Sequence, residues 1–330
     1  FCFVVMGVIM TFSLGFVPEG LWGTAILFYV LAILGFSGGN IFYDSLLMTV
    51  ADKERMDFVS ALGYALGYLG GGILFTLNVL MVLYPHVFDL QNTTEAIQMS
   101  FITVAIWWAV FSIPLFLLVG EQGGREHVAG RKTFFDGLQQ LISTLREIRK
   151  YRQIVLFLAS YWLYIDGADT IILMAVDYGM SLGLDSMGLI KALLITQFVG
   201  FPAAIAFGKI GEKTGTKTGI LTGISVYVLI TFYAFFMKHQ HDFYLLAVAV
   251  GLVQGGVQSL SRSFYAKLIP EKHAGEFFGF YNMLGKFAAI IGPFLMGCVS
   301  VTTGNPRYSV FAVIALFISG GTILYFVKEK

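Results

Sequence analysis

The stretch from Gly38 to Gly72 reads GGNIFYDSLLMTVADKERMDFVSALGYALGYLGGG, and the stretch from Gly255 to Pro293 reads GGVQSLSRSFYAKLIPEKHAGEFFGFYNMLGKFAAIIGP. Each has a glycine pair, a helix with a polar residue near one end, a short charged loop, and a helix rich in aromatic residues and glycine. The offset between them is 217 to 218 residues. Self-similarity of this kind indicates an internal repeat. The chain is therefore predicted to contain two related halves.

Composition assigns both halves to a membrane. Hydrophobic residues make up 57% of the chain and charged residues 12%, whereas soluble domains average about 25% charged residues. The apolar runs are continuous and do not alternate, which favours helices over a β-barrel. We predict ten spans, at about 1–17, 23–49, 58–84, 97–119, 154–178, 186–208, 217–237, 242–267, 276–301 and 307–327.

Several function classes find no support in the sequence. The net charge of +1 gives no basic surface for nucleic acid. Cys2 and Cys298 have neither disulfide nor metal-ligand spacing. The chain has no H-E-x-x-H and no G-x-S-x-G, and Gly279 to Lys286 has one residue too many for a phosphate loop. We therefore expect no enzyme activity, no metal and no cofactor.

Loop charges predict the orientation of the spans. By these spans, 16 Lys and Arg residues fall on one side and 2 on the other, and basic loops face the cytoplasm. The hydrophilic stretch 120–153 and the C-terminus lie on the basic side. Within that stretch, 135–148 has an apolar face followed by basic residues, which predicts an amphipathic helix on the inner membrane surface.

The repeat pairs the second and third spans with the eighth and ninth, so the repeating unit has six helices. The second half shows six spans and the first shows four, and Phe1 falls inside an apolar run. We expect two further N-terminal helices and twelve in all. The predicted domains are an N-terminal bundle at 1–119 (helices three to six of twelve), a linker at 120–153, and a C-terminal bundle at 154–330.

A loop after the sixth span supports this architecture. Gly208-Lys-Ile-Gly-Glu-Lys-Thr-Gly-Thr-Lys217 resembles the G-x-x-x-D-R-x-G-x-R loop of the major facilitator superfamily, with Glu212 and Lys213 in place of Asp and Arg. The resemblance implies an all-α membrane protein with two six-helix bundles, of which this chain carries ten helices. It also implies a secondary transporter that works by rocking of the bundles, as a monomer, on a small-molecule substrate within the lipid bilayer.

Three stretches resemble a particular family within that superfamily. They are Tyr161-Trp-Leu-Tyr-Ile-Asp-Gly-Ala-Asp-Thr170, Gly256-Val-Gln-Ser-Leu-Ser-Arg-Ser-Phe-Tyr265, and Glu276 through Phe287. The helix Tyr64-Ala-Leu-Gly-Tyr-Leu-Gly-Gly71 fits as well. Together they are similar to the autophagy-related vacuolar amino-acid effluxers and their bacterial relatives, the unknown major facilitator family. This resemblance implies amino-acid export or exchange.

Ionisable residues inside spans are costly and by default mark function. Asp166 and Lys286 lie roughly 18 Å and 15 Å along their helices from the cytoplasmic end, at a rise of 1.5 Å per residue. They are placed to bind the two ends of a zwitterion or to neutralise each other, and a structural Asp–Lys pair is the alternative. Asp169 is one turn from Asp166 and is expected to tune its proton affinity or to bind a coupling cation.

Aromatic residues surround these charges in the sequence. Tyr161, Tyr164 and Tyr281 are candidates for stacking on substrate, although an aromatic side chain that fills the bundle is the more common role. The substrate or proton-coupling candidates are therefore Asp166, Asp169, Lys286, Tyr164 and Tyr281.

The superfamily pattern places helices four, seven and ten around the central cavity. Asp44 falls on helix four and Arg262 on helix ten, as repeat equivalents one to two turns from the cytoplasm. We predict a cytoplasmic gate in which Arg262 meets Glu212, with Lys213 in the same loop and Asp44 facing the equivalent first-half loop. Substrate contact and snorkelling to the interface remain alternatives.

Glycines at small-x-x-x-small spacing predict close helix packing. Gly63, Gly67 and Gly71 form one such stripe, and Gly35/Gly39 and Gly251/Gly255 have the same spacing.

We expect the chain to be a permease for a small polar solute, amino acids first, with protons or another cation as coupling partner. The alternatives are a cation-coupled sugar symporter and, from another class, a transport-inactive membrane receptor or assembly factor. We expect it in the bacterial inner (plasma) membrane rather than the vacuolar membrane.

Overall fold

The computed structural model describes residues 1–119, 143, 148–270 and 274–328. Most of the predicted linker 120–153, including nearly all of its amphipathic helix 135–148, lies outside these residues. The described residues form two compact units. The first holds Phe1–Val50 and the chain from Gly70 to the end of α5, and the second holds Ala51–Leu69 and every described residue from Ser143 onward.

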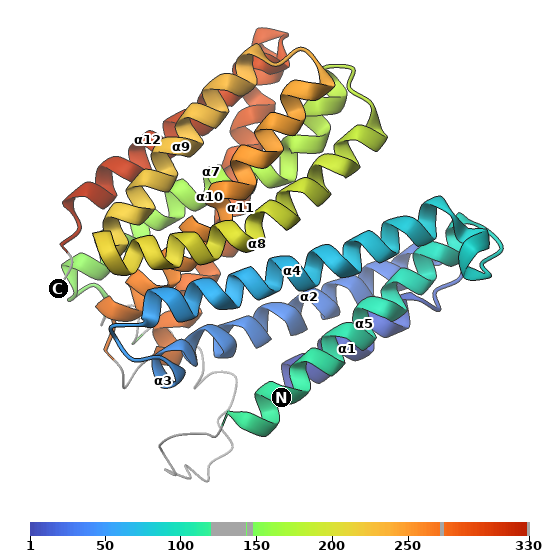
Figure 1. Cartoon of the computed structure of the whole chain (residues 1–330), viewed down its shortest axis with the longest axis horizontal. Coiled ribbons are helices and arrows are strands. Elements are labelled where there is room, and N and C mark those ends of the chain that lie inside the picture. Colours follow the sequence, from blue (N-terminus) through green and yellow to red (C-terminus); the bar gives the residue numbers. More distant parts are fainter. Residues whose placement is uncertain (120–142, 144–147, 271–273, 329–330) are drawn as a thin grey trace. The chain divides into compact units, whose positions relative to one another are not determined.

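The first unit is a bundle of apolar helices (Figure 1). It contains α1 (Cys2–Leu14), α2 (Trp22–Ser45), the short α3 (Leu47–Val50), the later part of α4 (Met56–Leu83), η1 (Pro85–Phe88) and α5 (Thr93–Leu118). Helix α1 packs against both α2 and α5. The start of α5 is fixed by Asn92, whose side chain accepts a hydrogen bond from the Glu95 amide at 2.9 Å and so caps the helix.

Glycines set the close approach of α1 to its neighbours. A Cβ built on Gly35 of α2 would lie 2.6 Å from the Gly7 Cα, and one on Gly7 would lie 2.1 Å from the Trp108 ring. Neither position has room for a larger residue. The predicted close packing at Gly35 is confirmed.

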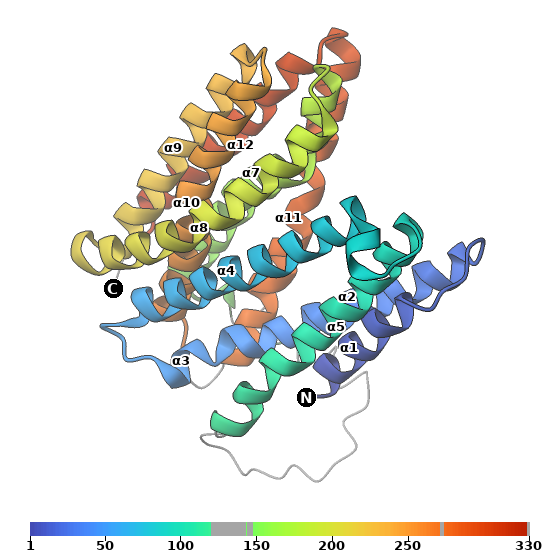
Figure 2. The same cartoon turned by 45° about the vertical axis from the view of Figure 1, so that its right-hand side comes forward.

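The second unit contains the first part of α4 and six further helices (Figure 2). These are α7 (Arg152–Ser181), α8 (Ser186–Thr214), α9 (Thr216–Phe236), α10 (Gln240–Leu268), α11 (Ala274–Thr303) and α12 (Val310–Phe326), with η3 (Pro306–Ser309) before the last. Helix α10 packs along α8 and α9, α12 packs along α7 and α9, and α11 packs along α7. Their shared core is rich in fully buried aromatic side chains, among them Phe157, Tyr164, Tyr227, Phe264, Phe277 and Phe317.

Helix ends in the second unit follow from local sequence. Asp185 caps α8 by accepting the Gly188 amide at 2.8 Å. Gly215, with φ at +93°, separates α8 from α9 in a conformation that side-chain-bearing residues rarely adopt. Asp185 thus marks the start of α8, and Gly215 marks the boundary between α8 and α9.

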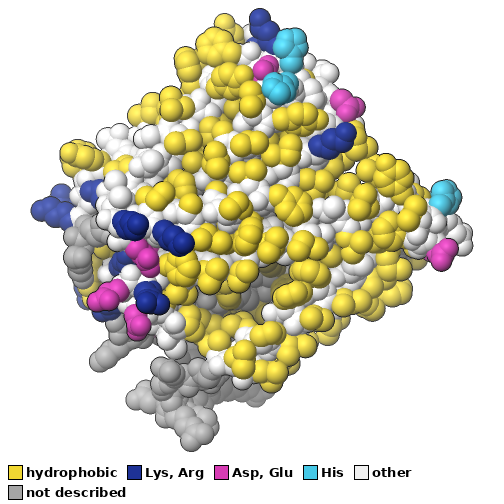
Figure 3. Space-filling view, viewed as in Figure 1, with side chains coloured by type: hydrophobic (Ala, Val, Ile, Leu, Met, Phe, Trp, Pro, Cys, Tyr) yellow, Lys and Arg dark blue, Asp and Glu magenta, His cyan; other side chains and the backbone are white. Residues whose placement is uncertain are grey.

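The predicted membrane spans are confirmed. Within the described ranges, nine helices are long and apolar enough to cross a bilayer, and the shorter α1 is apolar throughout. Figure 3 shows hydrophobic side chains along the flanks of the helices, and Lys and Arg side chains gathered where α8 ends and α9 begins. The chain is a multi-pass integral membrane protein.

Packing assigns one part of the predicted N-terminal bundle, Ala51–Leu69, to the second unit. Helix α4 runs unbroken from Met56 to Leu83, yet its residues up to Leu69 pack with the second unit. The reason is a row of polar contacts between the first turns of α4 and helices α9 and α10, described below.

Candidate functional site

Two carboxylates lie near the middle of α7 and have different surroundings. Asp166 is 1% exposed. Its two carboxylate oxygens accept the Gly292 amide of α11 at 3.0 and 3.1 Å, and the Thr170 hydroxyl donates to it at 3.4 Å. Asp166 therefore bonds to the backbone of a neighbouring helix.

Asp169, one turn further along α7, is partly buried. The Lys286 ammonium of α11 lies close enough for its charge to act on the Asp169 carboxylate, and the charge of Asp166 acts there as well. Lys286 itself is exposed. The predicted pairing of Lys286 with Asp166 stays a prediction, while the charge of Lys286 acts on Asp169.

The candidate tyrosines fill the space between α7, α10 and α11. Tyr161 and Tyr281 stack with ring centroids 4.2 Å apart, and Tyr281 stacks on Tyr265 at 5.0 Å. Tyr164 is fully buried, and its hydroxyl is hydrogen-bonded to the Ser261 hydroxyl of α10 at 2.7 Å. Tyr164 and Tyr281 are thus packed in the bundle in this structure, and the charge of Asp169 acts on Tyr161 of the aromatic stack.

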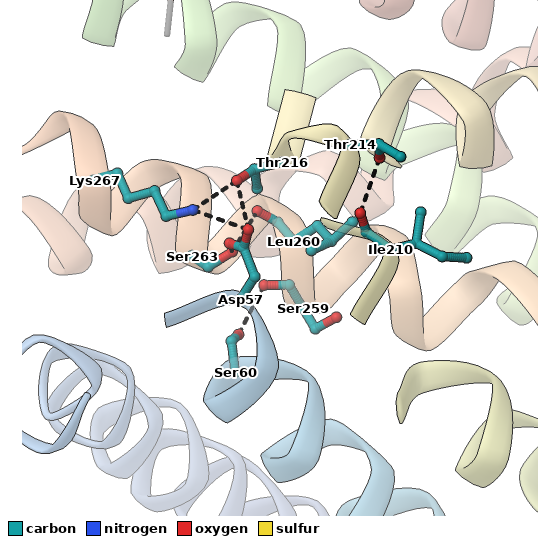
Figure 4. Close-up of polar contacts among 9 residues, drawn as sticks. All are labelled: Asp57, Ser60, Ile210, Thr214, Thr216, Ser259, Leu260, Ser263 and Lys267. Carbon is teal, nitrogen blue, oxygen red and sulfur yellow. Dashed lines mark hydrogen bonds and ion pairs between the residues drawn. The ribbon is translucent and has the colours of Figure 1, made fainter. Parts of the chain in front are cut away.

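A second polar cluster lies where α4 begins, among α4, α9 and α10 (Figure 4). Asp57 of α4 is 1% exposed. Its carboxylate accepts Ser263 at 2.6 Å, Thr216 at 2.7 Å and the Lys267 ammonium at 2.9 Å. Lys267 also donates to the Thr216 hydroxyl at 2.7 Å. We call these four residues the Asp57 cluster.

One turn further along α4, Ser60 is in contact with Arg262 of α10. Its guanidinium donates to the Ser60 hydroxyl and to the Ser60 carbonyl, both at 2.9 Å, and lies 4.8 Å from the centre of the Tyr64 ring. Ser60 in turn donates to the Ser259 carbonyl at 2.7 Å. Tyr68 then donates to Gln258 at 3.4 Å. Polar residues on one face of α4 thus match polar residues on one face of α10 over three turns.

The end of α8 and the start of α9 contribute to the same region. Gly208 lets α4 approach, because a Cβ there would lie 2.5 Å from the Ala61 Cβ. A Cβ on Gly211 would lie 3.3 Å from an Asp57 carboxylate oxygen. Lys217 donates to the Tyr325 and Val327 carbonyls at 2.6 and 2.7 Å and so caps the end of α12. The last turns of α8 therefore pack against the start of α4, and Gly211 lies beside the Asp57 carboxylate.

The other predicted gate residues are placed as follows. Glu212 and Lys213 are exposed at the end of α8. Asp44 is 8% exposed in the first unit. The predicted pairing of Arg262 with Glu212 stays a prediction, whereas its contacts with Ser60 and Tyr64 are observed.

Of the predicted packing glycines, Gly251 and Gly255 fulfil the expectation. A Cβ on Gly251 would lie 2.9 Å from the Thr196 carbonyl, and one on Gly255 would lie 2.7 Å from the Tyr68 ring. Among the described residues no atom lies within 4 Å of a Cβ built on Gly67, and its packing role stays a prediction. Gly63 is partly buried and Gly71 is exposed.

Sequence reasoning missed the Asp57 cluster. Asp57 lies next to the charged run Asp52 to Arg55 and just before a predicted span, so the sequence places it in a loop. Lys267 is the last residue of a predicted span and is one of the 16 Lys and Arg residues assigned to the basic side. A usable signal was the spacing of Asp57, Ser60 and Tyr64, which places three polar side chains on one face of a helix. Among the described residues, no group of three His, Cys, Asp or Glu could hold a metal ion.

Comparisons with known proteins agree with this architecture. The model of the family described as "Vacuole effluxer Atg22 like" matches residues 1–330. The MFS-type transporter YxiO of Bacillus subtilis is 41% identical, over 99% of this chain and 76% of that protein. Autophagy-related protein 22 of Candida glabrata is 25% identical, over 83% of this chain and 56% of that protein. This chain thus spans little more than half the length of the fungal relative.

Solved structures show the same fold. The Escherichia coli fucose:proton symporter FucP superposes with a TM-score of 0.71 at 11% identity, over 99% of this chain and 82% of that one. The proton:xylose symporter XylE superposes with a TM-score of 0.71 at 13% identity, over 99% and 80%. At these identities the likeness establishes the fold alone.

Proposed function

Because the chain belongs to the Atg22-like vacuole effluxer family of major facilitator transporters, we propose that it moves amino acids across a membrane by alternating access. The observation that carries the proposal is the opposite charge of Asp169 on α7 and Lys286 on α11 within one helix bundle. Both residues lie in the middle third of their 30-residue helices. Transporters of this architecture place their substrate sites at that depth.

The chemistry of this pair suits a zwitterion. A carboxylate attracts the α-ammonium group of an amino acid, and an ammonium attracts its α-carboxylate. In the absence of substrate, the two side chains compensate each other and lower the cost of two charges within the membrane. A neutral sugar would leave both charges without new partners, so the pair favours amino acids over sugars.

The Asp57 cluster supplies a gate in this proposal. The repeat assigns α4 to the first half of the protein and α9 and α10 to the second. The basic ends of the helices are taken to face the cytoplasm, so the cluster and Arg262 would fasten the halves on that side. Opening toward the cytoplasm would then require Asp57 to leave Ser263, Thr216 and Lys267.

The relatives support the direction and the membrane that we propose. The family description names an effluxer, and the bacterial relative favours the bacterial inner membrane over a vacuole. Asp169 is the proposed proton-coupling residue, because Lys286 and substrate both act on its charge.

The test is counterflow and uptake in proteoliposomes containing the intact protein, with a pool of labelled amino acids and with or without a pH gradient. We expect flux that falls by about a hundredfold in Asp169→Asn and Lys286→Met, as expected when substrate is no longer held in position. Asp177→Asn is the matched control, because Asp177 is an exposed carboxylate on the same helix. Flux that survives both substitutions would refute the assignment of the site. No flux of any amino acid in the folded wild type would refute the substrate class and direct the search to sugars or to a receptor role.

A further inference from the structure

Helix α11 is broken in its middle. Ala289 has φ −70° and ψ 17°, outside the helical range, and Pro293 lies four residues later. Proline has no amide hydrogen to donate to the carbonyl of residue 289, and its ring crowds that carbonyl. Helix α11 therefore consists of two segments, one before and one after this break.

After the break, a backbone amide of α11 donates its hydrogen bond to a side chain of another helix. The Gly292 amide donates to the Asp166 carboxylate, which is 1% exposed and 126 positions away in sequence. The close contact requires a glycine, because a Cβ on Gly292 would lie 1.8 Å from the Thr170 hydroxyl oxygen and 3.0 Å from an Asp166 oxygen. Asp166, Thr170 and Gly292 thus fit one another as a joint between α7 and α11.

Charge favours the same arrangement. The first amides of a helical segment carry a partial positive charge, and a carboxylate placed there is stabilising. Asp166 provides that carboxylate at the start of the second segment of α11. The joint therefore explains why Asp166 is buried, and the explanation requires neither a bound substrate nor an ion.

The joint is adjacent to the proposed substrate site on both helices. Asp169 lies three residues after Asp166 on α7, and Lys286 lies three residues before the break at Ala289 on α11. Any change in the joint would shift Lys286 relative to Asp169. We propose that Asp166 is a positioning residue that holds the break of α11 and thereby sets Lys286 opposite Asp169, an inference that rests on the proposed function of that pair. Under this proposal, proton coupling belongs to Asp169, and Asp166, the other candidate that the sequence offers, has a positioning role.

The first test compares Asp166→Asn with Asp166→Ala in the intact protein. Asparagine keeps an acceptor oxygen for the Gly292 amide, whereas alanine removes it. We expect transport within about threefold of wild type in D166N, since an acceptor is retained. In D166A we expect a loss of about tenfold or more, because the substrate groups are displaced. The dependence of D166N on the pH gradient should equal that of wild type.

The second test measures the joint directly and does not require transport. Cys298 lies in the second segment of α11 and is exposed, and Met180 of α7 is 49% exposed. With Cys2 replaced by serine and Met180 by cysteine, spin labels at 180 and 298 report the spacing of α7 and α11. We expect a shifted or broadened distance distribution in D166A and an unchanged one in D166N.

A third variant covers the case in which D166A folds poorly. Pro293→Ala restores an amide that can bond to the carbonyl of residue 289, which lets α11 become continuous. The loss of melting temperature caused by D166A should therefore be smaller in the P293A background than in wild type.

Two results would overturn the proposal. One is a D166N protein with unchanged label distances that no longer responds to the pH gradient, because Asp166 would then be the coupling residue. The other is a D166A protein with unchanged distances and melting temperature. If the wild type moves no amino acid, the proposed function fails, and the label distances and the P293A comparison still decide the role of Asp166.

Discussion

Removing the Asp57 carboxylate should open the basic end of the helices. The carboxylate accepts three hydrogen bonds, from Ser263, Thr216 and Lys267. Hydrogen bonds to a charged group contribute about 1.5–3 kcal/mol each, so the simple sum is about 4.5–9 kcal/mol. That sum is an upper bound on the effect of Asp57→Ala.

Two features of the structure make the expected effect of Asp57→Ala smaller than this sum. Ser263 also donates to the Leu260 carbonyl at 3.1 Å, so its hydroxyl keeps a partner. The Lys267 side chain is 26% exposed, so it regains water as well as keeping Thr216. We therefore expect D57A to destabilise the closed arrangement by about 2–3 kcal/mol. With about 1.4 kcal/mol for each factor of ten, the open fraction should rise about 30- to 150-fold.

The assay is alkylation of a buried cysteine. Ala65 lies two turns beyond Asp57 on α4 and is 0% exposed, so A65C can react only when the first turns of α4 separate from their neighbours. Cys2 and Cys298 are exposed and are first replaced by serine. A membrane-impermeant maleimide added to inside-out vesicles then labels A65C at a rate proportional to the open fraction.

The matched control is Glu212→Gln, which neutralises an exposed carboxylate at the end of α8. Exposed substitutions of this kind change stability by no more than about 0.5 kcal/mol, so labelling should rise little more than twofold. The reasoning is refuted if a folded D57A protein labels at the same rate as the control. It is also refuted if E212Q opens the protein as much as D57A, because the predicted Arg262–Glu212 pair would then be the main lock.

Four further substitutions test the packing and the caps. Gly255→Leu should prevent folding or lower stability by about 3 kcal/mol, the upper end of the usual cost of overpacking, because a Cβ there would lie 2.7 Å from the Tyr68 ring; expression and thermal melting check it. Tyr164→Phe removes a buried hydroxyl bond and should cost about 1 kcal/mol by melting without changing substrate affinity; a large change in affinity would make Tyr164 a substrate ligand. Asn92→Ala removes the cap of α5 and should cost about 1 kcal/mol, measured by hydrogen exchange at the start of that helix. Lys217→Met uncaps the end of α12 and should increase exchange there alone, whereas an effect spread over all helices would contradict a local capping role.

Sequence was sufficient for the spans and the family because these depend on local pattern. Continuous apolar runs specify membrane helices wherever they occur, whereas the repeat of two halves stays a prediction. Close packing at Gly35 and Gly251 followed from spacing, because a small residue on a helix interface has few other roles. The packing role of Gly67 stays a prediction, since spacing does not say which face of α4 meets a neighbour.

The candidate site was harder to predict because its pairs are distant in sequence. Asp166 and Asp169 are equivalent by sequence criteria, and what distinguishes them is that Asp166 meets the Gly292 amide while Asp169 meets the Lys286 charge. Pro293 was visible in its span, but its consequence for Asp166 depends on how α11 packs against α7. Asp57 was missed for a related reason, since a charge at a helix start becomes buried only when other helices cover it.

Helix α4 has a weak point where it passes from one unit to the other. Gly67, Gly70, Gly71 and Gly72 cluster around the boundary between Leu69 and Gly70. Each glycine in a helix costs about 0.8–1 kcal/mol relative to alanine, so four of them weaken this segment by about 3–4 kcal/mol in intrinsic helix propensity. A Cβ on Gly67 meets no described atom, and one on Gly70 has only ordinary contacts with Trp107 at 3.7 Å. Among the described residues, alanine would fit at both positions without a close contact. In the proposed gate, these glycines would provide a compliant section of backbone, so that the first turns of α4 could leave the Asp57 cluster while the turns beyond Gly72 stay packed.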